Sequence, residues 1–527
     1  MKASTLKTFT SVHTWTGLGA GMALFIAFYA GAITIFFHEL ESWEVYGAHS
    51  QVAQSVDDAQ QLVDRVITED PAAAAEFRLY PTQEGHPENV VYWYERHEDG
   101  SFEEHRYRMS DSGALDTRKS NEHLPNFIYR LHYTAGLPSS FGLYVLGIIC
   151  LLYGVALVTG LLIFLPKFLK DLLIVRSGKN KKQFWRDAHN VVGVISLPWH
   201  FMFAWSSAIL AIGIFFIAPF QLLVFEDDLL ELFGSELGII EAAEPSGEAG
   251  ALISVPEILA AAKREIPTIT TTQIRYYNAG DANGSIAVYG TIDEGTLSPN
   301  AVVTMAATSG EVIAVSNPES ATVGATIYQG LISLHFVSYG GFTAKWANFF
   351  LGLAGAFLFY SGNILWIETR RKRRSSEQPA TGRFLARLNS GVCIGCMAGI
   401  SAAFLASRVA AELVNRPEII EITYFGVFLA SIAWCFMRPV AAGTRDLLYA
   451  TAALTVAIPV FDALYTGMPL WTSLARGHWA LFTVDALAVA GAVVFWWLGR
   501  AVERRAYNGD VNSVWAQPLP QSAVAAP

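Results

Sequence analysis

Residues 18–37 read LGAGMALFIAFYAGAITIFF, twenty residues without a charged side chain. About 20 consecutive apolar residues allow an α-helix to cross the hydrocarbon core of a bilayer, so this run predicts a membrane span. Further apolar runs of this kind lie at 144–165, 191–216, 346–367, 391–410, 422–437, 447–465 and 479–498. The sequence therefore predicts a membrane protein built as an all-α helical bundle with about eight transmembrane helices.

The composition agrees with this fold class, because 16% of the 527 residues are charged, against roughly 25% in an average soluble chain. Basic residues cluster before the first span, between 167 and 186, at 370–374 and at 500–505. These clusters fall on one side of the predicted bundle, which places both termini in the cytoplasm. A signal peptide cleaved near Ala32 is an alternative, but the apolar run continues beyond that residue and favours an uncleaved span.

Two long stretches on the opposite, outer side are acidic. Residues 39–131 hold nineteen acidic and eight basic side chains, and residues 226–335 hold fifteen and three. Each stretch begins with an amphipathic helix, at 55–68 and 254–266, and continues with strand-like runs. The runs lie at 76–80, 90–95, 102–109, 270–278, 285–291, 301–307 and 311–315. We expect two small α+β domains. Their acidic surface either attracts cations or only keeps the domains soluble.

The membrane part contains an internal repeat. A histidine followed by a glycine four residues later opens the first and third spans, and a Leu-His pair precedes the second and fourth spans. The corresponding positions are His13 with Gly17, His189 with Gly193, His132 with Gly160, and His335 with Gly362. The order span, outer domain, span thus occurs twice and ends at the basic run 370–374.

Histidine is costly inside a membrane and usually marks a functional site there. His13 and His189 stand where the chain enters the membrane from the cytoplasm, and His132 and His335 where it enters from the outer domains. A six-coordinate haem takes two axial imidazoles at one depth. We therefore expect two haem groups, an inner one held by His13 and His189 and an outer one held by His132 and His335. The absence of a CxxCH attachment motif predicts b-type haem.

Other residues offer alternatives or additions to this set. His200 could be a deep ligand, since eleven residues separate it from His189 on nearly the same helix face, and His38 could replace an outer ligand. The four histidines could also be structural and only form hydrogen bonds at helix ends. Basic side chains that could meet haem propionates are Arg130, Arg186 and Lys345. Cys393 and Cys396 form a CxxC within an apolar helix and are interpreted as small packing residues.

Several function classes lack their motifs. The sequence contains no HExxH metalloprotease helix and no GxxxxGK[ST] phosphate loop, and nothing in it predicts a nucleic-acid partner. The cytoplasmic connections are too short for a flavin or nicotinamide domain. An electron donor would therefore be another protein or a lipid-soluble quinol.

The four histidine segments resemble those of a known family. Residues 1 to about 375 resemble the PepSY-associated transmembrane family of bacterial inner-membrane proteins, on the segments VHTWTG at 12–17, Leu-His at 131–132, FWRDAH at 184–189 and Leu-His at 334–335. The resemblance implies two PepSY-like periplasmic domains. Members include ferric-siderophore reductases with two b-type haems, which implies reduction of ferric siderophore in the periplasm. His132 and His335 would then hold the haem from which electrons leave.

The expected domain boundaries follow from these elements. They are 1–38 for the first span, 39–131 for the first outer domain, 132–225 for spans two and three, 226–334 for the second outer domain, 335–375 for span four with its basic run, 376–510 for spans five to eight, and 511–527 for a cytoplasmic tail.

Spans five to eight depart from the pattern, because His478 at the outer edge of span eight is their one histidine. They could dock a donor, bind quinol or mediate assembly. Two rival functions remain open. One is a transport component for a siderophore or metal, with the histidines as transient ligands. The other is a regulatory membrane protein whose histidines are structural.

Overall fold

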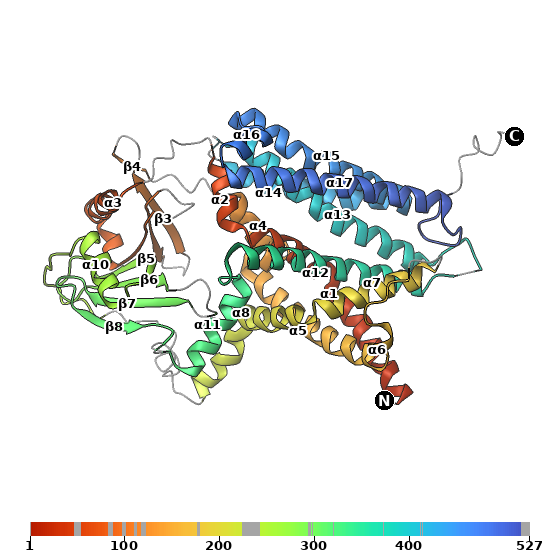
Figure 1. The fold of residues 1–527 in the computed structure, drawn as a ribbon, viewed down its shortest axis with the longest axis horizontal. Helices are drawn as coiled ribbons and strands as arrows, with labels where there is room; N and C mark the ends of the chain where they lie inside the picture. Colours follow the sequence, from red (N-terminus) through yellow and green to blue (C-terminus); the bar gives the residue numbers. More distant parts are fainter. Residues whose placement is uncertain are drawn as a thin grey trace. The chain divides into compact units, whose positions relative to one another are not determined.

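We describe the protein from a computed structural model (Figure 1). The structure describes residues 2–46, 54–82, 88–96, 102–109, 113–116, 123–176, 180–223, 243–292, 297, 299–319, 321–372, 374–411, 413 and 415–517. Residues 226–242, the first part of the predicted second outer domain, and residues 518–527 of the predicted tail lie outside these residues. The chain divides into two compact units. The helical unit is Met1–Ala48, Glu122–Ile214 and Trp346–Pro527, and the sheet unit is His49–Asn121 and Phe215–Lys345.

The helical unit contains the predicted membrane spans. In the described part of the chain, seven helices are long and apolar enough to cross a bilayer, and the number is eight if a bent helix pair counts as one span. The seven are α1 (Ala3–Thr34), α5 (Ser139–Phe164), α12 (Gly341–Thr369), α13 (Ala380–Val409), α14 (Arg416–Met437), α15 (Val440–Thr466) and α17 (Trp479–Asn508). The prediction of a helical membrane protein with about eight spans is therefore confirmed.

The third predicted span is the bent pair. Helices α7 (Lys181–Ile195) and α8 (Leu197–Leu223) meet at Ser196 with a bend of 70° between them. Pro198 lies directly after the break and has no N–H to donate to the carbonyl four residues earlier. The sequence run 191–216 is thus apolar enough to span a membrane, but it does not form one straight helix.

Shorter helices lie between the spans, and two of them, α2 and α4, share a core with the C-terminal helices. They are α2 (Phe37–Val45), α4 (Leu124–Thr134), α6 (Phe168–Asp171) and α16 (Leu470–Ala475), with a 3₁₀ turn at Leu165–Lys167. Fully buried Trp43 of α2, Leu124 and Ile128 of α4, and Tyr424 of α14 belong to one hydrophobic cluster with residues of α13 and α17. Burial of this surface stabilises α2 and α4 against α13–α17.

Among the described residues the sheet unit has eight strands, which include the seven that the sequence predicts, each to within one residue, and the unpredicted two-residue strand β4. They are β1 (Glu76–Tyr80), β2 (Val90–Arg96), β3 (Phe102–Met109), β4 (Leu115–Asp116), β5 (Thr270–Tyr277), β6 (Ser285–Thr291), β7 (Asn300–Ala306) and β8 (Val312–Ser316). The sequence predicts separate sheets for the two outer stretches. In the structure all strands form one antiparallel sheet, in the order β4-β3-β2-β1-β5-β6-β7-β8. The two halves of the sheet are joined by the pairing of β1 with β5, in which Phe77 lies opposite Tyr276. Backbone N–H and C=O groups that would be unpaired at two exposed strand edges therefore hydrogen-bond to each other.

Two helices of the sheet unit repeat the same design. Helices α3 (Val56–Glu69) and α10 (Val255–Glu265) each begin with a capping box, Ser55 with Asp58 and Ser254 with Glu257. Both helices and both halves of the sheet contribute to one hydrophobic core. The remaining elements are the 3₁₀ turn Pro71–Ala75 and helix α11 (Val323–Phe336), which ends before the glycine-rich start of α12.

Candidate cofactor site

The imidazole rings of His13 in α1 and His189 in α7 lie next to each other. Their centroids are 6.3 Å apart and their planes are inclined by 75°. Nδ1 of His13 lies 2.8 Å from the carbonyl oxygen of Ala156, and Nδ1 of His189 lies 3.1 Å from Oγ of Ser361. The carbonyl can only accept, and the Ser361 hydroxyl already donates to the carbonyl of Leu358, so both rings donate from Nδ1. Each ring therefore presents Nε2 as its ligand nitrogen.

A glycine lies beside each of these rings, and the one beside His13 makes room for it. A Cβ atom at Gly160 of α5 would lie 2.9 Å from Cε1 of His13, and one at Gly362 of α12 would lie 3.5 Å from Cε1 of His189. Ala156, whose carbonyl accepts from His13, lies four residues before Gly160, and Leu358, whose carbonyl accepts from Ser361, lies four residues before Gly362. The two histidines are thus held in corresponding ways, as the internal repeat predicts.

His132 lies in the last turn of α4 against α1. Its Nδ1 is 2.8 Å from the carbonyl oxygen of Ala27, and a Cβ atom at Gly31 would lie 2.6 Å from the same nitrogen. The ring is therefore oriented by a backbone carbonyl and seated on a glycine, in the manner of His13. Its predicted partner His335 lies near the end of α11, in the sheet unit. Because the two residues belong to different units, their pairing stays a prediction.

His200 is a buried residue of α8. Its Nδ1 bonds to the hydroxyl of Tyr153, its ring lies 5.7 Å from that of Phe28, and Nε2 has no partner among the described residues. The bend at Ser196 places His189 on α7 and His200 on α8. The prediction that both residues share one face of a single helix is therefore wrong. His38 differs again, because its side chain is 68% exposed and bonds to Glu41 in its own helix α2.

The basic side chains proposed for propionates have contacts of other kinds. Arg130 pairs with Glu421 of α14, and Arg186 lies 3.3 Å from Asp187. Lys345 lies 5.4 Å from the ring centre of Phe342. Contacts with protein carboxylates compete with a propionate at Arg130 and Arg186.

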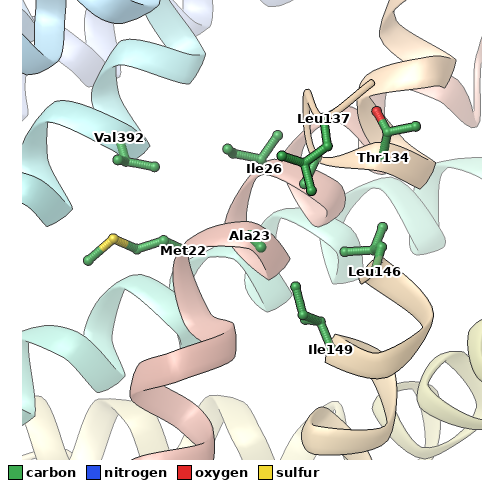
Figure 2. A pocket seen from close by; sticks show the side chains of 9 residues that line it. Met22, Ala23, Ile26, Thr134, Leu137, Leu146, Ile149 and Val392 are labelled. Atoms are coloured by element: carbon green, nitrogen blue, oxygen red, sulfur yellow. The ribbon is translucent and has the colours of Figure 1, made fainter. Parts of the chain in front are cut away.

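Cys393 and Cys396 lie buried in α13, which agrees with a packing role. A nearby cavity of about 180 Å³ is lined by apolar side chains of four segments (Figure 2). Met22, Ala23 and Ile26 of α1 face Leu146 of α5 and Val392 of α13 across it, beside the turn 134–137 that follows α4. No lining residue carries a titratable group, so this cavity is not a candidate for acid–base chemistry.

Three features of the helical unit could not be predicted from the sequence pattern. The first is Ser361, whose role depends on a contact between distant helices. The second is the carbonyl acceptors, which have no side-chain signal at all. The third is a group of charged residues within α13, α15 and α17, which the spans' high hydropathy concealed.

This fold and site define a class: membrane proteins with several spans, two of whose helices bring a pair of histidines together. The chain belongs to the family described as PepSY-associated TM region, whose model matches residues 10–369. The match ends with α12, so α13–α17 lie outside it. Uncharacterized protein PA4219 of Pseudomonas aeruginosa is 24% identical over 260 residues, which are 47% of this chain and 64% of that protein. This chain thus spans just under two thirds of that relative's length.

Proposed function

We propose that this protein is an inner-membrane oxidoreductase that holds two b-type haems and passes electrons across the bilayer to ferric siderophore in the periplasm. The observation that carries the proposal is the arrangement of His13 and His189. Two imidazoles that bind one metal ion from opposite sides, each at about 2 Å, have ring centroids roughly 6 Å apart. The observed separation of 6.3 Å fits that requirement.

The surroundings of both rings also fit a haem. Bis-histidine haem supplies reversible one-electron transfer without an open iron position for substrate. His13 and His189 would hold it through Nε2, because Nδ1 of each is engaged. The Nδ1 bonds fix the ring planes and increase the basicity of the ligand nitrogens. Gly160 keeps the space beside the His13 ring open.

The second haem would be held by His132 and His335. His132 is oriented by the Ala27 carbonyl in the way that the Ala156 carbonyl orients His13. That likeness between two histidines of one chain favours the same role for both residues. The acidic outer stretches of the chain would position the chelate, and a cytoplasmic protein or membrane quinol would donate the electron.

A visible absorption spectrum of the purified protein tests the cofactor. Soret and α bands that shift on addition of dithionite support the proposal. A preparation that shows no haem bands even after incubation with haem would favour a transport or regulatory role.

The activity is tested by mixing pre-reduced protein anaerobically with a ferric siderophore and a ferrous trap. The parent should reoxidise and yield trapped Fe(II), and the His132→Ala variant should stay reduced at its remaining haem for much longer. His38→Ala is the matched control, because that histidine is exposed and its loss should leave the rate unchanged. Equal rates for His132→Ala and the parent would contradict electron exit at the outer haem.

A further inference from the structure

Five charged side chains lie buried together between α2 and the C-terminal helices. They are Glu44 of α2, Arg408 of α13, Arg416 of α14, Asp462 of α15 and Asp485 of α17, and each is at most 3% exposed. We call them the buried charge cluster. Charged groups are rarely placed within membrane helices without a function or a partner.

Four members form two complete ion pairs. Nε of Arg408 lies 2.6 Å from Oδ1 of Asp462, and the other oxygen of Asp462 accepts from Nε1 of Trp43 at 2.6 Å. A guanidinium nitrogen of Arg416 lies 3.0 Å from Oε1 of Glu44. Because each of these charges has an opposite charge within hydrogen-bonding distance, the four residues compensate one another.

Asp485 is the fifth member and has no such partner. Its side chain is fully buried, and neither carboxyl oxygen has a hydrogen-bond partner among the described residues. Its carboxyl group lies close to that of Asp462. Three carboxyl groups therefore face two guanidinium groups, and the cluster lacks one positive charge.

The neighbouring elements do not supply that charge within the described part of the chain. On α2, Glu41 is acidic and bonds to His38. Helix α16 has no charged residue. After it, Arg476 is exposed with a guanidinium nitrogen 3.8 Å from Sδ of Met468, and the ring of His478 lies 4.9 Å from that of Tyr46.

The oxygen atoms at the site also favour a small occupant. Alkaline-earth ions such as Ca²⁺ take about six to eight oxygen ligands. Both oxygens of Asp462 are already used by Arg408 and Trp43, which leaves the two oxygens of Asp485. A proton needs one oxygen, and it converts a buried unpaired charge into a neutral carboxylic acid.

We propose that Asp485 and Asp462 form a proton-binding site in which Asp485 carries the proton. Asp485 lies six residues after Trp479, the first residue of α17, which is about 9 Å along the helix. The site is therefore near one end of the span, within reach of proton exchange with that side. It lies outside the region that the family model matches, and it does not depend on haem binding.

Proton occupancy would control the link between the C-terminal helices and α2. While Asp485 is neutral, Arg408 pairs with Asp462 and donates to the carbonyl oxygens of Trp43 and Glu44. Loss of the proton would place a second carboxylate in competition for Arg408. Glu44 in turn accepts from the backbone N–H of Leu124, the first residue of α4, so a change at the cluster reaches the helix that carries His132.

Infrared spectroscopy of the full-length protein tests the site. At neutral pH the parent should show a carbonyl band of a protonated carboxylic acid that shifts in D₂O and is absent from the Asp485→Asn variant. Glu418→Gln, at an exposed acid of α14, is the control and should keep the band. A band that Asp485→Asn leaves unchanged would overturn the proposal.

Thermal stability gives a second, independent readout. Asp485→Asn should unfold at about the parent's temperature at neutral pH, because a carboxamide replaces a neutral acid, whereas Asp462→Asn should unfold at a clearly lower temperature. Equal losses in both variants, or folding of Asp485→Glu but not of Asp485→Asn, would show that Asp485 is ionised and contradict the proposal. Stabilisation of the parent, but not of Asp485→Asn, by Na⁺ or Ca²⁺ would assign a cation to the site instead.

Discussion

Gly160 and His13 lie so close that a methyl group on the glycine would stand 2.9 Å from Cε1 of the imidazole. Real Cβ atoms are essentially never that close to another heavy atom, so Gly160→Ala should displace the ring from its bond to Ala156. We predict that this variant loses most of its inner haem or shifts its reduction potential. Gly154→Ala is the matched control, because a Cβ at Gly154 in the same helix meets no atom within 4 Å. Equal haem content and potential in Gly160→Ala, Gly154→Ala and the parent would contradict the assignment of His13.

The outer histidine allows the same experiment on α1. A Cβ at Gly31 would lie 2.6 Å from Nδ1 of His132, while one at Gly19 meets nothing within 4 Å. Gly31→Ala should therefore reduce the content of the outer haem and leave the inner haem spectrum intact, and Gly19→Ala should change neither. Optical redox titration distinguishes the two haems. Loss of the inner haem alone from Gly31→Ala would show that the assignment of the pairs is wrong.

The join between β1 and β5 predicts a large effect of one buried side chain. Phe77 of β1 is fully buried and stacks on Tyr276 of β5 with ring centroids 4.4 Å apart. Phe77→Ala should destabilise the sheet unit by about 3–5 kcal/mol, because it opens a cavity in the shared core. Hydrogen exchange in the full-length protein should then speed up in both halves of the sheet. Ile313→Ala, at a residue of β8 that is 62% exposed, is the control; faster exchange confined to β1–β4 would contradict one continuous sheet.

A loop of the sheet unit should respond to acid in a defined range. Hydrogen bonds from the backbone N–H groups of Ser246 and Asn283 lower the pKa of Asp281 to about 2. An unfolded aspartate titrates near 4, so this carboxylate stabilises the loop above that pH, and its contribution is lost as the pH falls towards 2. We predict that the amides of Ser246 and Gly247 lose protection from exchange in that range and, at neutral pH, in Asp281→Ala. The amide of Val288 in β6 is the reference. If neither acid nor Asp281→Ala reduces the protection of Ser246 and Gly247 relative to Val288, the role assigned to Asp281 is wrong.

Much of this architecture can be predicted from the sequence. Apolar runs identify the spans because the bilayer imposes a minimum length, and alternating patterns identify the strands because one face of each is buried. The repeat of His13 and His189 at one depth predicts that they meet, and in the structure they do. Each of these features depends on local pattern or on a simple rule about membrane depth.

Other features depend on contacts that no local pattern encodes. The pairing of β1 with β5 joins strands almost two hundred residues apart in the chain, and either strand could have remained an edge. Arg408, Asp462 and Asp485 lie on three different helices with otherwise apolar surroundings in the sequence, so their association is visible only once α13, α15 and α17 are packed. Pro198 is a sequence signal for the bend at Ser196. The apolar character of residues 191–216 nevertheless favours the prediction of one continuous span.

The central claim is that His13 and His189 hold one and the same haem, and a pyridine haemochrome assay on single and double variants tests it most directly. The account predicts two haems per chain in the parent and one in His13→Ala, in His189→Ala and in the double variant, because the second substitution removes a ligand of a haem that is already lost. Each variant should retain the spectrum of the outer haem. A double variant without haem, while each single variant keeps one, would show that the two histidines serve different haems. Two haems in either single variant would show that the residue is not a ligand.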